Sequence, residues 1–229
     1  MTKAKTTNQF KVKRLTVSAL MIALSTFISM ICALIPGLNF SFGGGITVGS
    51  MLPIVIVSYI YGVRWGLFTS FVYSVFQMMI GGNTVMALFL PGSDTYSNIL
   101  NAVLICLIDY VIAYTVLGVG GAFRGLKKKN GEDNKVLGIL LGVLLALSLR
   151  YVAHIASGAI FYGSYAEWFF TDTAIADLEI SRNIMEKFSG ASLALVYSIV
   201  YNGCYMIPEI VITALAALGV ARLPVVKKQ

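Results

Sequence analysis

The sequence predicts an all-α integral membrane protein in which six transmembrane helices form a single bundle. Hydrophobic residues make up 58% of the 229 residues, charged residues only 12%, and the mean hydropathy is +0.83. Soluble domains carry about 25% charged residues. The charges of this chain lie mostly between long apolar runs, as in helices that cross a bilayer. Because six spans of about 20 residues use most of the chain, we expect one membrane domain over residues 1–229.

The apolar runs define six candidate spans. In chain order they are Leu15–Ile35, Val48–Tyr61, Trp65–Ile80, Ile99–Val119, Val136–Tyr162 and Ala191–Ala221. The first span follows a basic tail, residues 1–14, but it is too long for the h-region of a signal peptide and lacks a clear small-residue cleavage site. Pro36 and the glycine run 43–45 then predict an irregular segment. The second and third spans are short, and the three residues 62–64 between them predict a tight hairpin.

The distribution of Lys and Arg predicts which helix ends face the cytoplasm. Of the 17 basic residues, all but Arg150, Arg182 and Lys187 lie in the two chain tails, the 62–64 turn or the loop between the fourth and fifth spans. Cytoplasmic loops carry the excess of Lys and Arg in membrane proteins. We therefore expect both termini, including a tail over residues 222–229, to be cytoplasmic, in a multi-pass protein of the plasma membrane.

The connection between the fifth and sixth spans is the longest predicted outer loop. It covers residues 166–190 and holds five acidic residues against two basic ones. We expect it to be extracellular. It is long enough to fold over the outer mouth of the bundle as a lid.

Several classes of function lack the residues that they need. The net charge of +7 follows from the topology of the basic loops, so no nucleic-acid partner is expected. The three Cys lie far apart, each in an apolar run, so we expect them to be reduced and to serve in packing. The sequence has a single His, so we expect no metal site. The sequence has no G-x-x-x-x-G-K-[ST] phosphate loop, no H-E-x-x-H and no G-x-S-x-G motif. ATP hydrolysis is thus outside the competence of this chain, and we expect neither catalytic residues nor a cofactor.

Ionisable side chains inside spans are costly, so each is a candidate functional residue. Asp109 lies about 11 residues into the fourth span, about 16 Å below its outer end and near the middle of the membrane. Arg150 and His154 share one face of the fifth span because they are four residues apart. The sixth span adds a polar stripe, which consists of Tyr197, Tyr201, Asn202, Tyr205 and Glu209.

A carboxylate among aromatic rings suits an organic cation, since ion pairing and cation–π attraction both gain from desolvation. The polar stripes therefore predict an outward-facing pocket for a small molecule. Structural roles compete with this interpretation. Asp109 pairs with Arg150 in one alternative, and His154 makes only an interhelical hydrogen bond in another. Tyr162 belongs to an interfacial aromatic belt in a third, and for Glu209 we favour a structural role.

Several stretches together resemble the ThiT/YuaJ family of thiamine-binding S components. They are GGG at 43–45 with MLPI at 51–54, YGVRWGL at 61–67, residues 77–81, LIDYVIAY at 107–114, LRYVAHIASG at 149–158 and YSIVYN at 197–202 running to Pro208. The matches follow one another over nearly the whole chain, and their combination is specific although each is short. S components are the substrate-capture subunits of energy-coupling factor (ECF) vitamin importers, which also contain a transmembrane T component and two cytoplasmic ATPases.

The resemblance implies that the chain captures thiamine from outside for ATP-driven uptake and is not itself an enzyme. It implies that Asp109 faces the thiamine cation and that His154 contacts the ligand. An aromatic residue of the first outer segment, Phe40 or Phe42, is expected to complete the site. The full set of expected ligand-binding residues is Asp109, His154, Tyr162, Tyr197, Asn202, Tyr201, Phe40 and Phe42.

The resemblance also implies a docking surface on the first span. Ala19 and Ala23 have the small-xxx-small spacing that is typical of contacts between membrane helices. In the family this face would contact the T component. The expected partners are thus thiamine, the T component, the two ATPases and the lipid bilayer.

Two departures from the family pattern keep other functions open. Residues 166–190 stand where relatives have a short segment, and the third-to-fourth loop is longer around 91–98; both lie at the predicted outer mouth. The nearest alternative is an S component or facilitator for another small nutrient, such as a pyrimidine precursor of thiamine. An intramembrane lipid-modifying enzyme with His154 as base and Asp109 as its partner, and a solitary proton-coupled carrier, are more distant ones.

Overall fold

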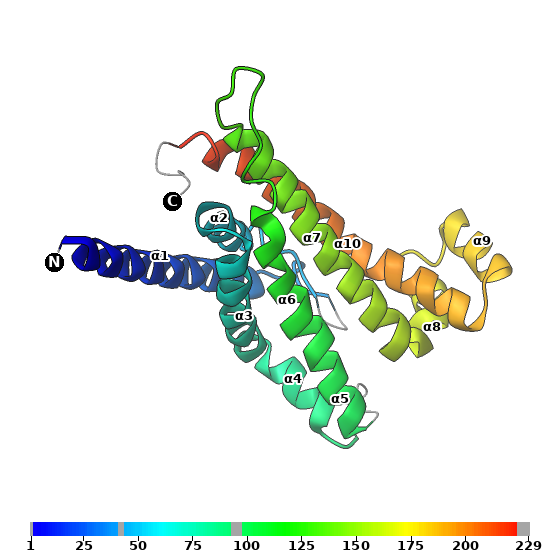
Figure 1. The fold of residues 1–229 in the computed structure, drawn as a ribbon. Helices are drawn as coiled ribbons and strands as arrows, with labels where there is room; N and C mark the ends of the chain where they lie inside the picture. The colour runs from blue at the N-terminus through cyan, green and yellow to red at the C-terminus, as the bar shows by residue number, and fades with distance from the viewer. Residues whose placement is uncertain (1, 41–43, 93–97, 224–229) are drawn as a thin grey trace.

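The computed structural model describes residues 2–40, 44–92 and 98–223 (Figure 1). Helices account for nearly all of its regular structure, and within these ranges there is no β-strand, only two isolated bridges at Asn39–Gly45 and Lys127–Asp133. The all-α prediction is confirmed.

The chain consists of long helices and groups of short helical elements between them. In order they are α1 (Thr2–Ala33), α2 (Leu52–Tyr61), α3 (Val63–Ile80), α4 (Gly82–Phe89), α5 (Ile99–Ile105), η1 (Cys106–Ile112), α6 (Ala113–Thr115), η2 (Val116–Gly121), α7 (Lys135–Phe161), η3 (Gly163–Tyr165), α8 (Ala166–Thr171), α9 (Glu179–Lys187) and α10 (Gly190–Val220). The elements from α5 to η2 follow one another without a break and form one span. Figure 1 shows α7 and α10 side by side along their length.

Four helical stretches of the described residues are long and apolar enough to cross a membrane. They are Asn8–Ala33, Ile99–Gly121, Lys135–Phe161 and Gly190–Val220. Helices α3 and α4 pass the same test only as a pair, and a bend of 74° separates them. Helix α2 has 10 residues and is about 15 Å long, half of the hydrocarbon thickness. The count of six spans, and the orientation with both termini inside, therefore stay predictions.

Helix α2 lies at the centre of the bundle. Every residue from Leu52 to Ile60 is buried, and α2 contacts α1, α3, η2 and α7. Such all-round burial requires close neighbours, and glycines in η2 and α7 allow the approach. A Cβ atom added at Gly142 of α7 would overlap the carbonyl oxygen of Gly120. Many large apolar side chains on the outside of α1 and α10 stay exposed, Leu20 and Leu215 among them, as lipid-facing residues do.

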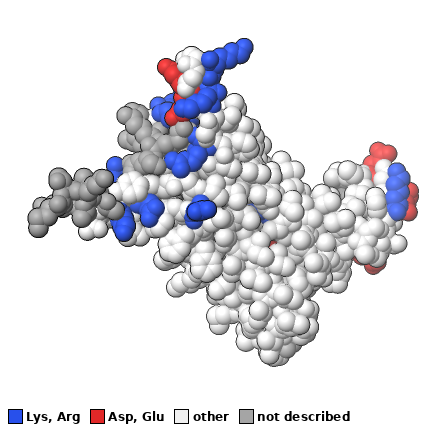
Figure 2. All heavy atoms as spheres, in the orientation of Figure 1, with Lys and Arg blue, Asp and Glu red and all other residues white. Residues whose placement is uncertain are grey.

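The connection between α7 and α10 is helical and packed, whereas we expected a loop over 166–190. Helices α8 and α9 form there because Phe169 and Phe170 bury their rings against α10. Helix α4 likewise occupies part of the expected third-to-fourth loop. Figure 2 shows Lys and Arg gathered around the N-terminal end of α1 and the loop before α7, with a smaller mixed cluster at the far tip formed by α9.

Candidate ligand-binding site

A cavity opens between the α5–η2 span, α7 and α10, and side chains of α4 also line it. Six of the eight expected ligand-binding residues line the cavity. Its walls are formed by Gly44, Thr84, Leu88, Ile105, Asp109, Tyr110, Tyr114, Arg150, His154, Gly158, Tyr162, Tyr197, Tyr201, Asn202 and Tyr205.

Asp109 lies on η1, a π-helical stretch in the middle of the α5–η2 span. A π-turn holds more residues than an α-turn, and such turns are frequent at functional sites. The wider turn changes the faces on which Asp109 and Tyr110 emerge, and both line the cavity. The side chain of Asp109 is 20% exposed. The carboxylate is therefore largely desolvated, yet it remains accessible from the cavity.

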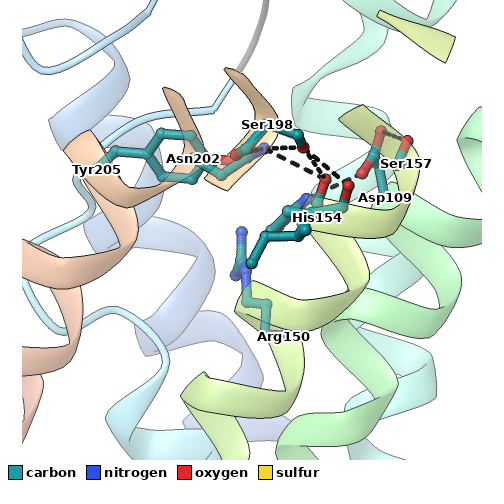
Figure 3. Close-up of polar contacts among 8 residues, drawn as sticks. Asp109, Arg150, His154, Ser157, Ser198, Asn202 and Tyr205 are labelled. Atoms are coloured by element: carbon teal, nitrogen blue, oxygen red, sulfur yellow. Dashed lines mark hydrogen bonds and ion pairs between the residues drawn. The ribbon is translucent and has the colours of Figure 1, made fainter. Parts of the chain in front are cut away.

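Two residues of α7 hold this carboxylate (Figure 3). Asp109 Oδ1 lies 2.9 Å from His154 Nδ1, and Oδ2 accepts a hydrogen bond of 2.7 Å from Ser157 Oγ. His154 and Ser157 are three residues apart and so lie on the same face of the helix. Each carboxylate oxygen accepts one bond from the protein and retains capacity for a ligand.

Arg150 fixes the tautomer of His154. Its Nε donates to His154 Nε2 at 3.2 Å, so Nε2 is the acceptor of the imidazole and Nδ1 carries the proton that is donated to Asp109. His154 is therefore neutral in this arrangement. The charges of Arg150 and Asp109 lie at opposite edges of the same uncharged ring, so the direct ion pair between them, one of our alternatives, does not form in this structure.

Arg150 itself is buried, with 5% of its surface exposed. Its guanidinium carbon lies 3.9 Å from the ring centre of Tyr114, a cation–π contact, and Nη1 donates to Met51 Sδ at 2.8 Å. Among the described residues Arg150 forms no direct ion pair with a carboxylate. The cavity thus has an anionic edge at Asp109 and a cationic edge at Arg150.

Helix α10 forms the opposite wall. Asn202 Nδ2 donates to the carbonyl oxygens of His154 at 3.3 Å and Ser198 at 2.8 Å, and its Oδ1 accepts from the Tyr205 hydroxyl. These bonds fix the Asn202 amide and, through it, the position of Tyr205. Gly158 permits the contact, because a Cβ there would overlap Ser198 Oγ. Asn202 therefore joins α7 to α10 directly behind His154.

A covering segment, defined here as residues 38–40 and 44–49, packs against one side of the cavity. The Phe40 ring packs on Tyr201 and Tyr205, with centroids 5.9 Å and 5.6 Å away. Gly44 lines the cavity and lies so close to the Tyr205 ring that a Cβ would collide with it. Phe40 thus contacts the pocket from behind its tyrosines, and Phe42 lies outside the described residues.

Glu209 anchors the base of the covering segment. It is fully buried, and its carboxylate accepts hydrogen bonds from the backbone N–H groups of Thr47 at 2.6 Å and Gly49 at 3.0 Å and from Thr213 Oγ1 at 3.2 Å. Val48, between the two backbone donors, has φ of 48°, which turns both N–H groups toward one acceptor. This is the structural role that we favoured for Glu209.

Several cavity residues escaped the sequence analysis. Tyr110 and Tyr114 are four apart on the helix of Asp109, a spacing visible in the sequence, and Tyr205 belongs to the stripe that we described but did not include in the site. Arg150 was a candidate as an ionisable residue inside a span, but we did not include it among the expected ligand-binding residues. Thr84 had no sequence indication, because it lies on α4, where we expected a loop.

A second hollow lies elsewhere, between α1 and α3. It is almost wholly apolar, and Ala19 and Ala23 form part of its floor with Phe27, Val72 and Phe76.

No group of three or more His, Cys, Asp or Glu residues that could hold a metal ion occurs in the part of the chain that the structure describes. The lining of the polar cavity, a carboxylate among tyrosine rings, suits a small organic molecule with a cationic group toward Asp109 and aromatic rings around it.

Comparisons with known proteins agree with this chemistry. A sequence model of the thiamine transporter protein family Thia_YuaJ matches residues 15–168. The thiamine transporter ThiT of Bacillus subtilis (strain 168) is 26% identical over 200 residues, which cover 85% of this chain and 84% of that protein. A solved structure of ThiT from Listeria monocytogenes superposes with a TM-score of 0.58 at 17% identity and covers 92% of this chain and 95% of that one. The last match shows a shared fold.

Proposed function

The chain belongs to the Thia_YuaJ family of thiamine transporter proteins, and on this premise we propose that it captures thiamine outside the cell as the S component of an ECF importer. As a member of this family, the chain is a multi-pass membrane protein that takes part in transport, and it is not an enzyme.

The observation that carries the proposal is the desolvated carboxylate of Asp109 inside a cavity lined by tyrosines. Thiamine has a permanently charged thiazolium ring, and a cation bound here gains from the carboxylate and from ring faces together. Its aminopyrimidine ring needs hydrogen-bonding partners and flat apolar surface, which the tyrosine hydroxyls and rings of the cavity offer. We therefore assign the ligand site to Asp109, His154, Tyr162, Tyr197, Tyr201 and Asn202, with Phe40 supporting it from the covering segment.

The proposed coupling to ATPases follows from what the chain lacks and from the hollow on α1. A chain with no phosphate-binding loop leaves ATP hydrolysis to another subunit if its uptake is driven by ATP. Ala19 and Ala23 lie exposed in the apolar hollow between α1 and α3. Small residues let a second membrane helix approach closely, so we assign this hollow to the T component, which would connect the chain to two cytoplasmic ATPases.

Thiamine binding to the purified full chain in detergent tests the ligand assignment. Isothermal titration calorimetry should give saturable binding at one site. A dissociation constant weaker than about 1 mM, about −4 kcal/mol, contradicts the proposal. Competition by the separate pyrimidine and thiazole alcohols tests the nearest alternative, because a receptor for the pyrimidine precursor binds that fragment more tightly than whole thiamine.

Reconstitution tests the coupling separately. We expect thiamine uptake into vesicles only when the T component, both ATPases and ATP accompany the chain. Uptake by the chain alone would instead identify a solitary carrier. Mass spectrometry of the molecule that copurifies with the protein identifies the ligand independently of both assays.

A further inference from the structure

The helices between α7 and α10 pack directly behind the pocket. Ala166, Phe169 and Phe170 of α8 form a buried cluster with Leu193 and Tyr197 of α10. Helix α9 covers this cluster from outside through Ile184 and Met185, and Figure 1 shows both short helices beside one end of α10. The segment is therefore part of the packed structure at the pocket.

Phe169 contacts two pocket tyrosines at once. Its ring centroid lies 5.2 Å from that of Tyr197 at an interplanar angle of 71°, and 5.7 Å from that of Tyr201 at 74°. Both contacts are edge-to-face, the arrangement that aromatic quadrupoles prefer. Tyr197 and Tyr201 line the cavity. Phe169 does not line it, and only 8% of its surface is exposed.

The covering segment also contacts Tyr201. Phe40 meets Tyr201 edge-to-face at 5.9 Å and 80°. Tyr201 thus contacts aromatic residues from two segments that are distant in the sequence: Phe40, before α2, and Phe169, after α7. Tyr197 packs beside it, with ring centroids 5.6 Å apart. The orientation of both rings therefore depends on contacts from outside α10.

We propose that Phe169 is a positioning residue, which holds Tyr197 and Tyr201 in the orientation that binds the ligand and thereby sets its affinity. Attraction between a cation and a ring requires the ring face to point at the charge. A ring that is free to change rotamer must be ordered when the ligand binds, which costs affinity. Because Phe169 already holds both rings in the free protein, the ligand does not have to order them. The inference rests on the proposed function, since it concerns the affinity of the same site.

Phe170 is the matched control. It lies on the same short helix, belongs to the same cluster and is even more buried, at 2% exposed. Among the described residues its ring contact is with Phe169, at 5.1 Å, and neither Tyr197 nor Tyr201 makes a ring contact with it. Replacing either phenylalanine by leucine removes the same atoms from the same cluster, but only Phe169→Leu removes ring contacts to the pocket tyrosines.

The experiment compares Phe169→Leu, Phe170→Leu and Phe169→Tyr in the full chain, by calorimetric titration with thiamine and by melting temperature without ligand. We expect both leucine variants to lower the melting temperature similarly. Phe169→Leu should weaken thiamine binding about tenfold, since one aromatic pair is worth a factor of about 2 to 12 and two are lost. The affinity of Phe170→Leu for thiamine should stay within about twofold of the wild type. The affinity of Phe169→Tyr, which keeps an aromatic ring at this position, should stay within about threefold.

Equal losses of affinity in Phe169→Leu and Phe170→Leu would overturn the inference, because Phe169 would then act only through stability. Unchanged affinity in Phe169→Leu would overturn it as well. If this variant does not fold, Phe169→Met, which retains an unbranched apolar chain without a ring, takes its place under the same criteria. Absence of thiamine binding in the wild type contradicts the proposed function instead, and so distinguishes the two failures.

Discussion

Replacing Asp109 with asparagine removes the negative charge of the cavity and leaves its shape almost unchanged. The amide oxygen still accepts from His154 Nδ1, 2.9 Å away, and the Ser157 hydroxyl, 2.7 Å from the other carboxylate oxygen, rotates to accept from the new amide N–H. The variant should therefore fold, and its effect on binding reports on charge.

The expected size of the effect follows from the burial of the group. Two unit charges 4 Å apart attract by about 4 kcal/mol at an effective dielectric constant of 20, and removing one partner of a buried charge pair costs about 2–5 kcal/mol. Asp109 is 20% exposed, so solvent screens part of this attraction and we expect the lower part of the range. A loss of about 2–3 kcal/mol corresponds to about 30- to 140-fold weaker binding.

Isothermal titration calorimetry with thiamine measures this loss. Ser157→Ala is the control, because it removes one hydrogen bond to the carboxylate, worth about 1 kcal/mol, but keeps the charge. It should weaken binding about fivefold. The assignment of Asp109 to the ligand cation is refuted if Asp109→Asn binds thiamine within threefold of the wild type, or if Ser157→Ala loses as much as Asp109→Asn.

Three further perturbations test other parts of the structure. Glu209→Gln replaces an acceptor of two backbone N–H groups and should speed thiamine dissociation about tenfold through loss of about 1–2 kcal/mol, measured by stopped flow; an unchanged rate contradicts the anchoring role. Gly142→Ala should destabilise the protein by about 1–3 kcal/mol, seen as a lower melting temperature, whereas Gly219→Ala, whose Cβ would meet no neighbour, should not. Ala23→Phe should fill the apolar hollow and abolish copurification with the T component while thiamine binding persists; Leu20→Phe, outside the hollow, is its control.

The sequence alone was sufficient to predict the placement of those site residues whose position follows from helical periodicity. His154 and Ser157 share a face because of their spacing, and the cost of burying polar groups in lipid requires that such faces meet. Asp109 opposite His154, and Asn202 behind it, agree with that argument. These placements needed no knowledge of the connections between helices.

Other features depend on packing that periodicity does not encode. A π-turn at Asp109 changes which face each following residue occupies, and nothing in residues 106–112 marks it. The direct pair of Asp109 with Arg150 was plausible from charge alone, but in the structure the imidazole of His154 lies between them. Helices α4, α8 and α9 were missed because they are too short and too mixed in composition for a membrane span. The aromatic contacts of α8 with α10 are what favour a helix there.

The anchoring of the covering segment by Glu209 also bears on how the chain is made. The two backbone N–H groups that donate hydrogen bonds to Glu209 lie 162 and 160 residues earlier in the sequence. Tyr197 and Asn202 of the pocket belong to the same helix as Glu209, the last one of the chain. During synthesis the early segment therefore emerges and enters the membrane long before its anchor exists. A chain interrupted before α10 has neither the far wall of the pocket nor the attachment of its cover. The nascent protein thus acquires its binding site in a single late step, when the final helix inserts.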